Sequence, residues 1–252
     1  MAEFTDDFDG PGLDRTVWMP YYLPHWSSRA TSAAAFDVRD SLVRLTIPVD
    51  QGLWCADVHS PSLRVSGIQS GHLDGQQPFV DAQRVAEPQA ELRGWLPSEG
   101  LFEVRARMGL SPRSMASVWM VGFEDAPERC GEICVFEIFG DSGSADGATY
   151  EVGQGVHPFR DPSLTDDFAA PPRTIDIGEH HVFGAERTRG RTVFSIDGEI
   201  VRTVDQAPDY PLQVMIGVFD FPEREGPDDH EPWLEVDWVR GPSGRYKVSA
   251  TV

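Results

Sequence analysis

Apolar and polar residues alternate one by one through most of the apolar segments of this chain, as they do in strands with one buried face. Residues 101–109 show this pattern clearly, with apolar side chains at 102, 104, 106 and 108 and charged ones between them. Comparable segments lie at 34–37, 42–48, 116–123, 148–157, 181–187, 192–203, 212–219 and 233–240. No segment shows helical periodicity over more than a turn or two. The pattern predicts an all-β protein.

Turn-forming residues divide these segments at short intervals. The 252 residues include 24 glycines and 20 prolines, and Asp197-Gly198 between two apolar runs is typical of a two-residue hairpin turn. Many short strands with frequent turns predict a β-sandwich. No interior linker is evident, since residues 158–173 are better interpreted as a loop, so a single domain over residues 1–252 is expected. The irregular stretch 50–100 is typical of binding loops.

The charge balance excludes several classes of partner. Lys and Arg number 21 and Asp and Glu number 41, which gives a net charge of −20 and argues against binding to nucleic acids or anionic membranes. No apolar run approaches the length of a transmembrane helix. The acidic first residues lack a basic and then apolar leader, so the expected location is the cytoplasm, or outside the cell if a leader has been removed. We expect a monomer.

The three cysteines, Cys55, Cys130 and Cys134, offer no complete disulfide framework because their number is odd. Cys130 and Cys134 are too far apart on one extended strand to form a disulfide. Buried free thiols are therefore expected.

The segment 131–140 places two carboxylates in an otherwise apolar strand. Period two puts Glu132 and Cys134 on one face and Glu137 on the other. A one-residue β-bulge between them would return Glu137 to the face of Glu132, and bulges are frequent beside active sites. Two interpretations are open at this point: a pair of acids at a cleft, or one cleft residue and one ordinary edge charge.

Several segments in chain order resemble glycoside hydrolase family 16, the laminarinase and lichenase-like group. The family signature, Glu-x-Asp-x-x-Glu after a glycine, is matched by residues 131–137 except at its middle position, where Cys134 replaces the aspartate. The other matching segments are residues 6–10, 100–105, 118–120, 155–157, 181–183, 196–198 and 236–240. The resemblance therefore runs from about residue 4 to about residue 241.

The resemblance implies a jelly roll of two curved antiparallel sheets with a concave substrate cleft. It also implies a retaining endo-glycoside hydrolase that acts on β-1,3 or β-1,3/1,4-glucan by double displacement and requires no cofactor. Glu132 would be the nucleophile and Glu137 the acid/base, about 5–5.5 Å apart as retention requires. Repulsion between the two would keep Glu137 protonated. With a neutral thiol at Cys134, we expect Glu132 to ionise more easily but to be held less firmly.

Aromatic side chains are the natural platforms for the apolar faces of sugars. Trp119 is the best cleft candidate, with an ordinary core position as its alternative. Trp26, Trp54 and Trp95 lie in loop-like stretches, where they would either bind substrate or anchor the loops. His157 matches the position of a cleft-facing histidine in the family, although a lone strand histidine is more often a satisfied neighbour. Cys134 is included among the substrate-contacting candidates.

A structural calcium site is a further implication of the resemblance. Asp7 and Asp237 would supply its side-chain ligands, since Ca²⁺ prefers oxygen, and a structural charge pair is the competing interpretation for Asp237. The acidic stretch 228–231 is better interpreted as a solvated loop than as a cation site. Two other functions stay open: a non-catalytic carbohydrate-binding sandwich, and a hydrolase of the same clan that acts on a galactan-type polysaccharide.

Overall fold

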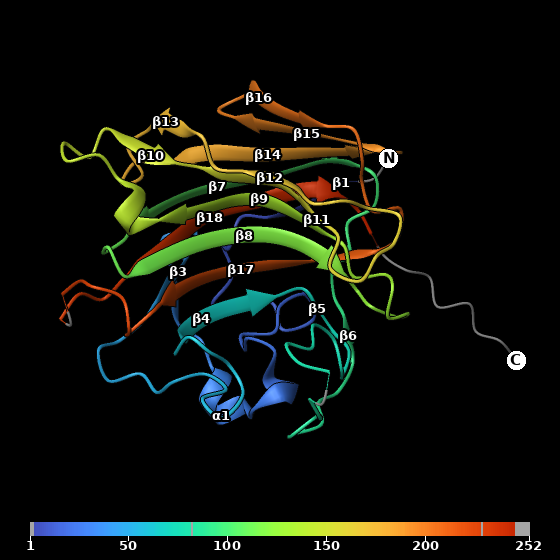
Figure 1. The fold of residues 1–252 in the computed structure, drawn as a ribbon, viewed down its shortest axis with the longest axis horizontal. Helices are drawn as coiled ribbons and strands as arrows, with labels where there is room; N and C mark the ends of the chain where they lie inside the picture. Colours follow the sequence, from blue (N-terminus) through green and yellow to red (C-terminus); the bar gives the residue numbers. More distant parts are fainter. Residues whose placement is uncertain (1–2, 82, 228, 245–252) are drawn as a thin grey trace, which may run out of the picture.

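Two large antiparallel sheets lie face to face in the computed structural model, which describes residues 3–81, 83–227 and 229–244 (Figure 1). The sheet that carries the segment 131–140 is called the front sheet. Its strands, in spatial order, are β12 (Asp167–Ala169), β11 (Gly153–His157), β9 (Glu132–Phe139), β8 (Ser114–Gly122), β17 (Leu212–Asp220) and β4 (Arg64–Gln69).

The second large sheet is called the back sheet. Its strands, in spatial order, are β16 (Glu199–Val204), β15 (Arg191–Ile196), β14 (His181–Thr188), β7 (Gly100–Gly109), β18 (Trp233–Pro242), β3 (Leu42–Thr46) and β2 (Ala35–Arg39), with β1 (Glu3–Asp6) also paired to β18. Two small ribbons pair β5 (Gly71–His72) with β6 (Leu92–Arg93) and β10 (Thr149–Glu151) with β13 (Pro172–Thr174). The helical segments are η1 (Pro24–Trp26), α1 (Arg29–Ser32) and η2 (Gly140–Ser142).

The all-β prediction is confirmed, and so is the absence of long helices in the described part of the chain, where α1 has four residues. Three strands within 50–100 were not predicted. The longest of them, β4, is buried on both faces, so its residues do not alternate and the sequence gives no period-two signal. The predicted loop 158–173 also contains β12 and the start of β13.

The main core fills the space between the two sheets. The even positions of β7 point into it and are at most 1 % exposed, as the alternation predicted. The ring of Phe136 on the front sheet packs against that of Phe183 on the back sheet, with centroids 4.4 Å apart. This contact shows that inward-facing residues of the two sheets interdigitate.

A second apolar cluster lies on the other face of the front sheet. It joins Trp119 of β8 and Met215 of β17 to Tyr22 and Trp54 from the loops before β2 and β4. The long irregular region is therefore packed over the front sheet, where it forms one wall of the site described below.

The three cysteines are buried and free, as predicted. Among the described residues, no helix is long and apolar enough to cross a membrane.

Candidate active site

A β-bulge in β9 determines where the two glutamates point. Trp119 of β8 lies opposite Cys134, whereas the preceding Val118 lies opposite Phe136, so Val135 is an additional residue with no partner. The pairing of β9 with β11 shifts at the same place. Both Val135 and Phe136 belong to the core between the sheets, which is the signature of one inserted residue.

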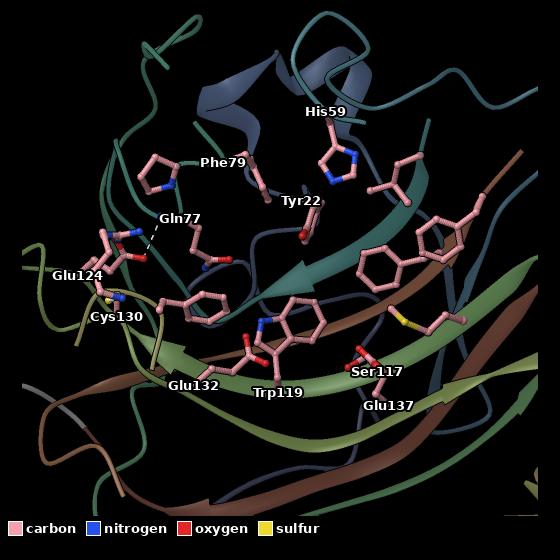
Figure 2. A pocket seen from close by; sticks show the side chains of 17 residues that line it. Tyr22, His59, Gln77, Phe79, Ser117, Trp119, Glu124, Cys130, Glu132 and Glu137 are labelled. Atoms are coloured by element: carbon pink, nitrogen blue, oxygen red, sulfur yellow. Dashed lines mark hydrogen bonds and ion pairs between the residues drawn. The ribbon is translucent and has the colours of Figure 1, made fainter. Parts of the chain in front are cut away.

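The bulge places Glu132 and Glu137 on the same face of the front sheet, so the first of the two interpretations of this strand is correct. Figure 2 shows both carboxyl groups directed into one cavity on either side of Trp119. The cavity has a volume of about 290 Å³. Its lining comprises Tyr22, His59, Leu63, Gln77, Pro78, Phe79, Met115, Ser117, Trp119, Glu124, Cys130, Glu132, Glu137, Phe159, Arg160, Phe219 and Phe221.

The two carboxyl groups influence each other and differ in their surroundings. Burial, together with the nearby charge of Glu137, raises the pKa of Glu132 to about 8. Burial also raises the pKa of Glu137, but the positive charges of His157 and Arg224 partly offset this. The pair therefore retains a proton near neutral pH.

The raised pKa of Glu132 differs from the sequence-based expectation that this residue ionises more easily. The expectation considered the loss of the aspartate charge at Cys134 and not the burial of Glu132, which raises its pKa.

Trp119 forms part of the cavity floor and is 7 % exposed. Its ring contacts those of Tyr22 and Phe219, with centroids 6.4 and 6.0 Å away. Of the tryptophans predicted to bind substrate, Trp119 is the one that lines this cavity in the described part of the chain.

Trp26, Trp54 and Trp95 have anchoring positions instead. Each is buried, and each indole N–H donates to a backbone carbonyl of a distant segment. The acceptors are the carbonyl oxygens of Gln76, Tyr22 and Pro242, at 2.8, 2.9 and 3.0 Å respectively. Of the two roles expected for these three tryptophans, loop anchoring is the one observed, and the predicted cleft lining is not, because loops that cover a sheet need buried anchors with satisfied N–H groups.

Cys134 does not line the cavity either. It is 2 % exposed, and its Sγ lies 3.9 Å from the carbonyl oxygen of Gly153 on β11. Burial and the two glutamates keep the pKa of the thiol well above its usual value. Cys134 therefore acts as neutral packing material between the acids, and the predicted contact with substrate is wrong.

His157 lies opposite Glu132 in the pairing of β11 with β9. Its Nδ1 is 2.6 Å from Asp166 Oδ1, and its ring stacks on Phe168 at 4.8 Å. The ring is outside the cavity lining. His157 thus contributes charge near the acids, while its hydrogen bond goes to Asp166.

Sequence reasoning did not single out most of the cavity wall. The side chains of His59 and Phe79 come from the irregular region 50–100, which was expected to build binding loops. Glu124 and Arg160 form an ion pair of 2.5 Å in this wall, and burial raises the pKa of Glu124 to about 7. The backbone N–H of Gln77 donates to Glu124 Oε1 at 2.9 Å. The irregularity of residues 50–100 was the one sequence signal that this region contributes to the cavity wall.

The residues expected to hold calcium face arginines. Asp237 is bound to Arg105, and Asp7 lies 3.8 Å from Arg240. Cationic neighbours do not fit a calcium site, and the charge pair proposed as the alternative for Asp237 is present. In the acidic stretch 228–231, Asp228 lies outside the described residues.

Comparisons with known proteins agree with the two-sheet fold. No protein-family model and no curated protein matches the sequence. A solved structure of a GlcNAcα1-4Gal-releasing endo-β-galactosidase from Clostridium perfringens matches with a TM-score of 0.81 and 25% identity over 94% of this chain, and the chain spans 61% of the length of that structure. A laminarinase from Flavobacterium sp. UMI-01 matches with a TM-score of 0.63 and 16% identity over 94% of this chain and 97% of its own.

A third solved structure, SCLam, is described as a non-specific endo-β-1,3(4)-glucanase from family GH16. It matches with a TM-score of 0.62 and 16% identity over 94% of this chain and 88% of its own. These three structures are described as endo-acting glycosidases of differing specificity, and a Crh5 transglycosylase also matches, with a TM-score of 0.63 and 14% identity over 97% of this chain and 85% of its own. The chain therefore has the jelly-roll fold of the family 16 glycoside hydrolases.

Proposed function

We propose that this protein is a retaining endo-glycosidase whose catalytic pair is Glu132 and Glu137. The observation that carries the proposal is the bulge at Val135, which directs both carboxyl groups into one aromatic-lined cavity. Hydrolysis of a glycosidic bond needs two such groups, one ionised and one protonated. A pair that shares one proton near neutral pH meets this requirement.

The resemblance to family 16 assigns the nucleophile to Glu132 and the acid/base to Glu137. In the first step, the carboxylate attacks the anomeric carbon while the acid gives its proton to the leaving oxygen. Water then attacks the glycosyl-enzyme ester, and the base takes back a proton. Because burial raises the pKa of Glu132 to about 8, this assignment requires Glu132 to be ionised and Glu137 protonated once the glycosidic oxygen lies beside Glu137.

An azide experiment tests the assignment of roles. With an activated β-glycoside, a Glu137→Ala variant should form the glycosyl-enzyme, and azide should then give the β-azide product. Glu132→Ala cannot form that ester, so azide should displace the leaving group directly and give the α-azide. The opposite pattern would show that the two roles are exchanged.

For the substrate, we favour a glycan with an internal β-galactosidic bond. The supporting observation is the difference in structural similarity: 0.81 for the endo-β-galactosidase against 0.62–0.63 for the two glucanases. β-1,3- or β-1,3/1,4-glucan is the second candidate, because two of the matching structures are a laminarinase and an endo-β-1,3(4)-glucanase.

A panel of β-galactan, O-glycan, laminarin and lichenan substrates tests this choice, with product stereochemistry followed by NMR. Release of β-configured galactose-terminated products supports the proposal, and preferential cleavage of laminarin supports the second candidate. Saturable binding without product from any substrate would instead identify a carbohydrate-binding sandwich. Running Cys134→Asp alongside tests whether the thiol weakens catalysis, since a large gain in turnover would show that it does.

A further inference from the structure

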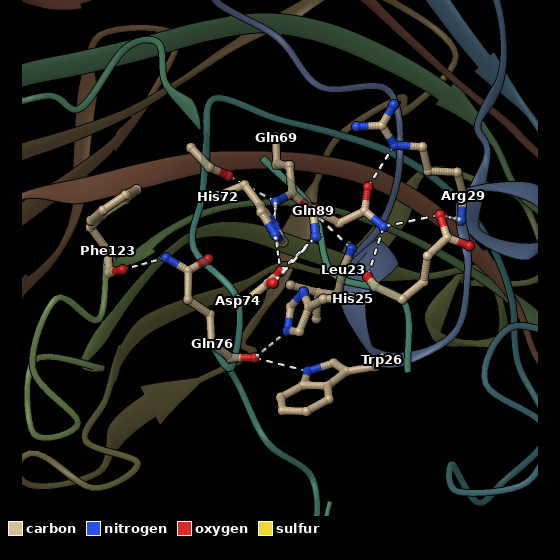
Figure 3. A network of polar contacts seen from close by, with 12 residues as sticks. Leu23, His25, Trp26, Arg29, Gln69, His72, Asp74, Gln76, Gln89 and Phe123 are labelled. Carbon is tan, nitrogen blue, oxygen red and sulfur yellow. Dashed lines mark hydrogen bonds and ion pairs between the residues drawn. The ribbon is translucent and has the colours of Figure 1, made fainter. Parts of the chain in front are cut away.

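A second polar cluster lies in the loops beside the front sheet, apart from the two glutamates. It consists of His25 in η1, His72 in β5 and Asp74 just after it (Figure 3). One potential ligand atom from each residue lies within 4.8 Å of the other two. Both imidazoles are completely buried, whereas Asp74 is partly open to solvent, with 30 % of its side chain exposed.

The hydrogen bonds of His25 leave one ring nitrogen without a partner. Its Nε2 lies 3.1 Å from the carbonyl oxygen of Gln76, which can only accept, so Nε2 carries the hydrogen. Nδ1 is then a bare lone pair, and it is buried without a hydrogen-bond partner. Figure 3 shows this nitrogen turned toward Asp74 and His72. An unsatisfied buried acceptor of this kind is costly and calls for an explanation.

The hydrogen bonds around His25 and Asp74 resemble those that usually orient the ligands of a metal ion. A histidine that binds a metal through one nitrogen commonly donates its other N–H to a backbone carbonyl or carboxylate, as His25 does to Gln76. Asp74 is supported as well, because the backbone N–H of Gln89 lies 3.1 and 3.2 Å from its two carboxylate oxygens.

We propose that His25, His72 and Asp74 form a binding site for one divalent transition metal ion, with Zn²⁺ the best match. Two imidazoles and a carboxylate suit Zn²⁺ better than Ca²⁺ or Mg²⁺, which prefer oxygen ligands. Water would complete the coordination from the open side at Asp74. Tetrahedral zinc with bonds of about 2.0–2.1 Å needs donor atoms about 3.4 Å apart, so the three side chains would close by on the order of 1 Å.

Binding requires one rearrangement at His72. Its Nε2 now lies 3.0 Å from Asp74 Oδ1, and its Nδ1 lies 3.4 Å from the amide nitrogen of Gln69. The metal takes the Nε2 lone pair, and the hydrogen moves to Nδ1. The Gln69 amide must then turn to accept it, which breaks its present hydrogen bonds to the carbonyl oxygen of Gly71 and from the N–H of Leu23. The number of protons on the imidazole is unchanged.

The position of the site indicates what the ion would do. Trp26, directly after His25, donates through Nε1 to the carbonyl oxygens of Gln76 and Gln77, and Gln77 lines the cavity. The ion would therefore fasten the segment 72–79 to η1 and hold one wall of the cavity in place. The role is structural, and it does not depend on which reaction the glutamates catalyse.

Zinc titration of the full chain, stripped with EDTA, tests the proposal with a chromophoric chelator as competitor. We expect the wild type to bind one equivalent of Zn²⁺, and we expect His25→Gln and Asp74→Asn to weaken that binding about tenfold or more. The matched control is His181→Gln, which removes a histidine from another His–carboxylate pair, 2.7 Å from Asp197 Oδ2. It should bind zinc like the wild type.

Two further readouts keep the result interpretable if a variant folds poorly. Zn²⁺ should raise the Tm of the wild type and of His181→Gln but not that of the other variants, and Co²⁺ bound in place of zinc should show the visible spectrum of a low-coordinate nitrogen and oxygen site. Absence of one-equivalent binding by the wild type would overturn the proposal. So would affinity that is unchanged in both His25→Gln and Asp74→Asn.

Discussion

The two faces of the front sheet are built from alternate residues of the same strands, yet they differ in almost every respect. The inner face is apolar and packs against the back sheet, with Phe136 in contact with Phe183. The outer face carries two acids and a tryptophan and is roofed by loops that lie far away in the sequence. Strand periodicity predicts the inner face except at Phe136, which points inward because of the bulge, whereas the outer face depends on both the bulge and loop conformation.

The largest contrast between the faces should be seen in turnover. Replacement of Glu132 or Glu137 by glutamine should lower kcat on the order of 10³-fold or more, because each removes a group that reacts directly. Glu103→Gln, on β7 of the back sheet, is the matched control and should retain activity. Full activity in either of the first two variants, measured on the preferred glycan, would remove that residue from the mechanism.

A buried inner-face residue should affect stability instead. Phe136→Ala should lower the free energy of unfolding by about 3–5 kcal/mol, since it leaves a cavity between the sheets. Urea unfolding followed by tryptophan fluorescence measures this change. A loss below about 1 kcal/mol would mean that the two sheets are not tightly packed at this position.

The acids of the outer face should make stability depend on pH. The pKa of Glu132 in the folded protein, about 8, lies above its ordinary value of 4.5, so the folded state binds the proton more tightly than the unfolded state. Stability is therefore fully present below about pH 4.5 and falls as the pH rises toward about 8, by on the order of a few kcal/mol. Glu132→Gln should remove most of this dependence and raise the Tm at pH 8.

The same proton should shape the activity profile. Above about pH 8 the pair loses its last proton and has no acid, so kcat/KM should fall there. An alkaline limb near pH 5 would contradict a buried pair that retains its proton at neutral pH. A pH–rate profile on one soluble substrate measures this limb.

Trp119 should show a smaller effect that is confined to substrate. Trp119→Ala should lower kcat/KM about tenfold through lost ring contact with a sugar, whereas Trp95→Ala should act on stability because that ring is buried in the core between the sheets. Equal effects of the two changes on KM would contradict the assignment of Trp119 as a platform for a sugar and of Trp95 as a buried anchor.

The smallest effect is expected at Cys134. Its thiol is buried outside the cavity lining and contacts Gly153 and Ser117, so Cys134→Ser should change kcat less than about tenfold. A much larger loss, measured with the same substrate, would give the thiol a role beyond packing.

The sequence predicted the front sheet largely because β8, β9 and β17 combine high apolar content with clear boundaries. It also raised the bulge as one of two options for Glu137, but period two alone could not choose between them, since the choice depends on pairing with β8 and β11. The sequence could not decide the roles of Trp26, Trp54 and Trp95. Whether an indole in a loop anchors that loop depends on carbonyl groups that are distant in the sequence. The raised pKa of Glu132 could not follow from motif comparison, since it depends on burial.

The inserted Val135 ties the orientation of the two glutamates to the packing of their own strand. If β9 kept the same residues but paired without the bulge, Glu137 would turn into the apolar core and Phe136 would turn outward into the cavity, which would bury a charge and expose a ring. Deletion of Val135 would instead leave a regular strand in which Glu132, Cys134 and Glu137 again share one face. The five-residue spacing of the two acids therefore requires the bulge, whereas a four-residue spacing would not.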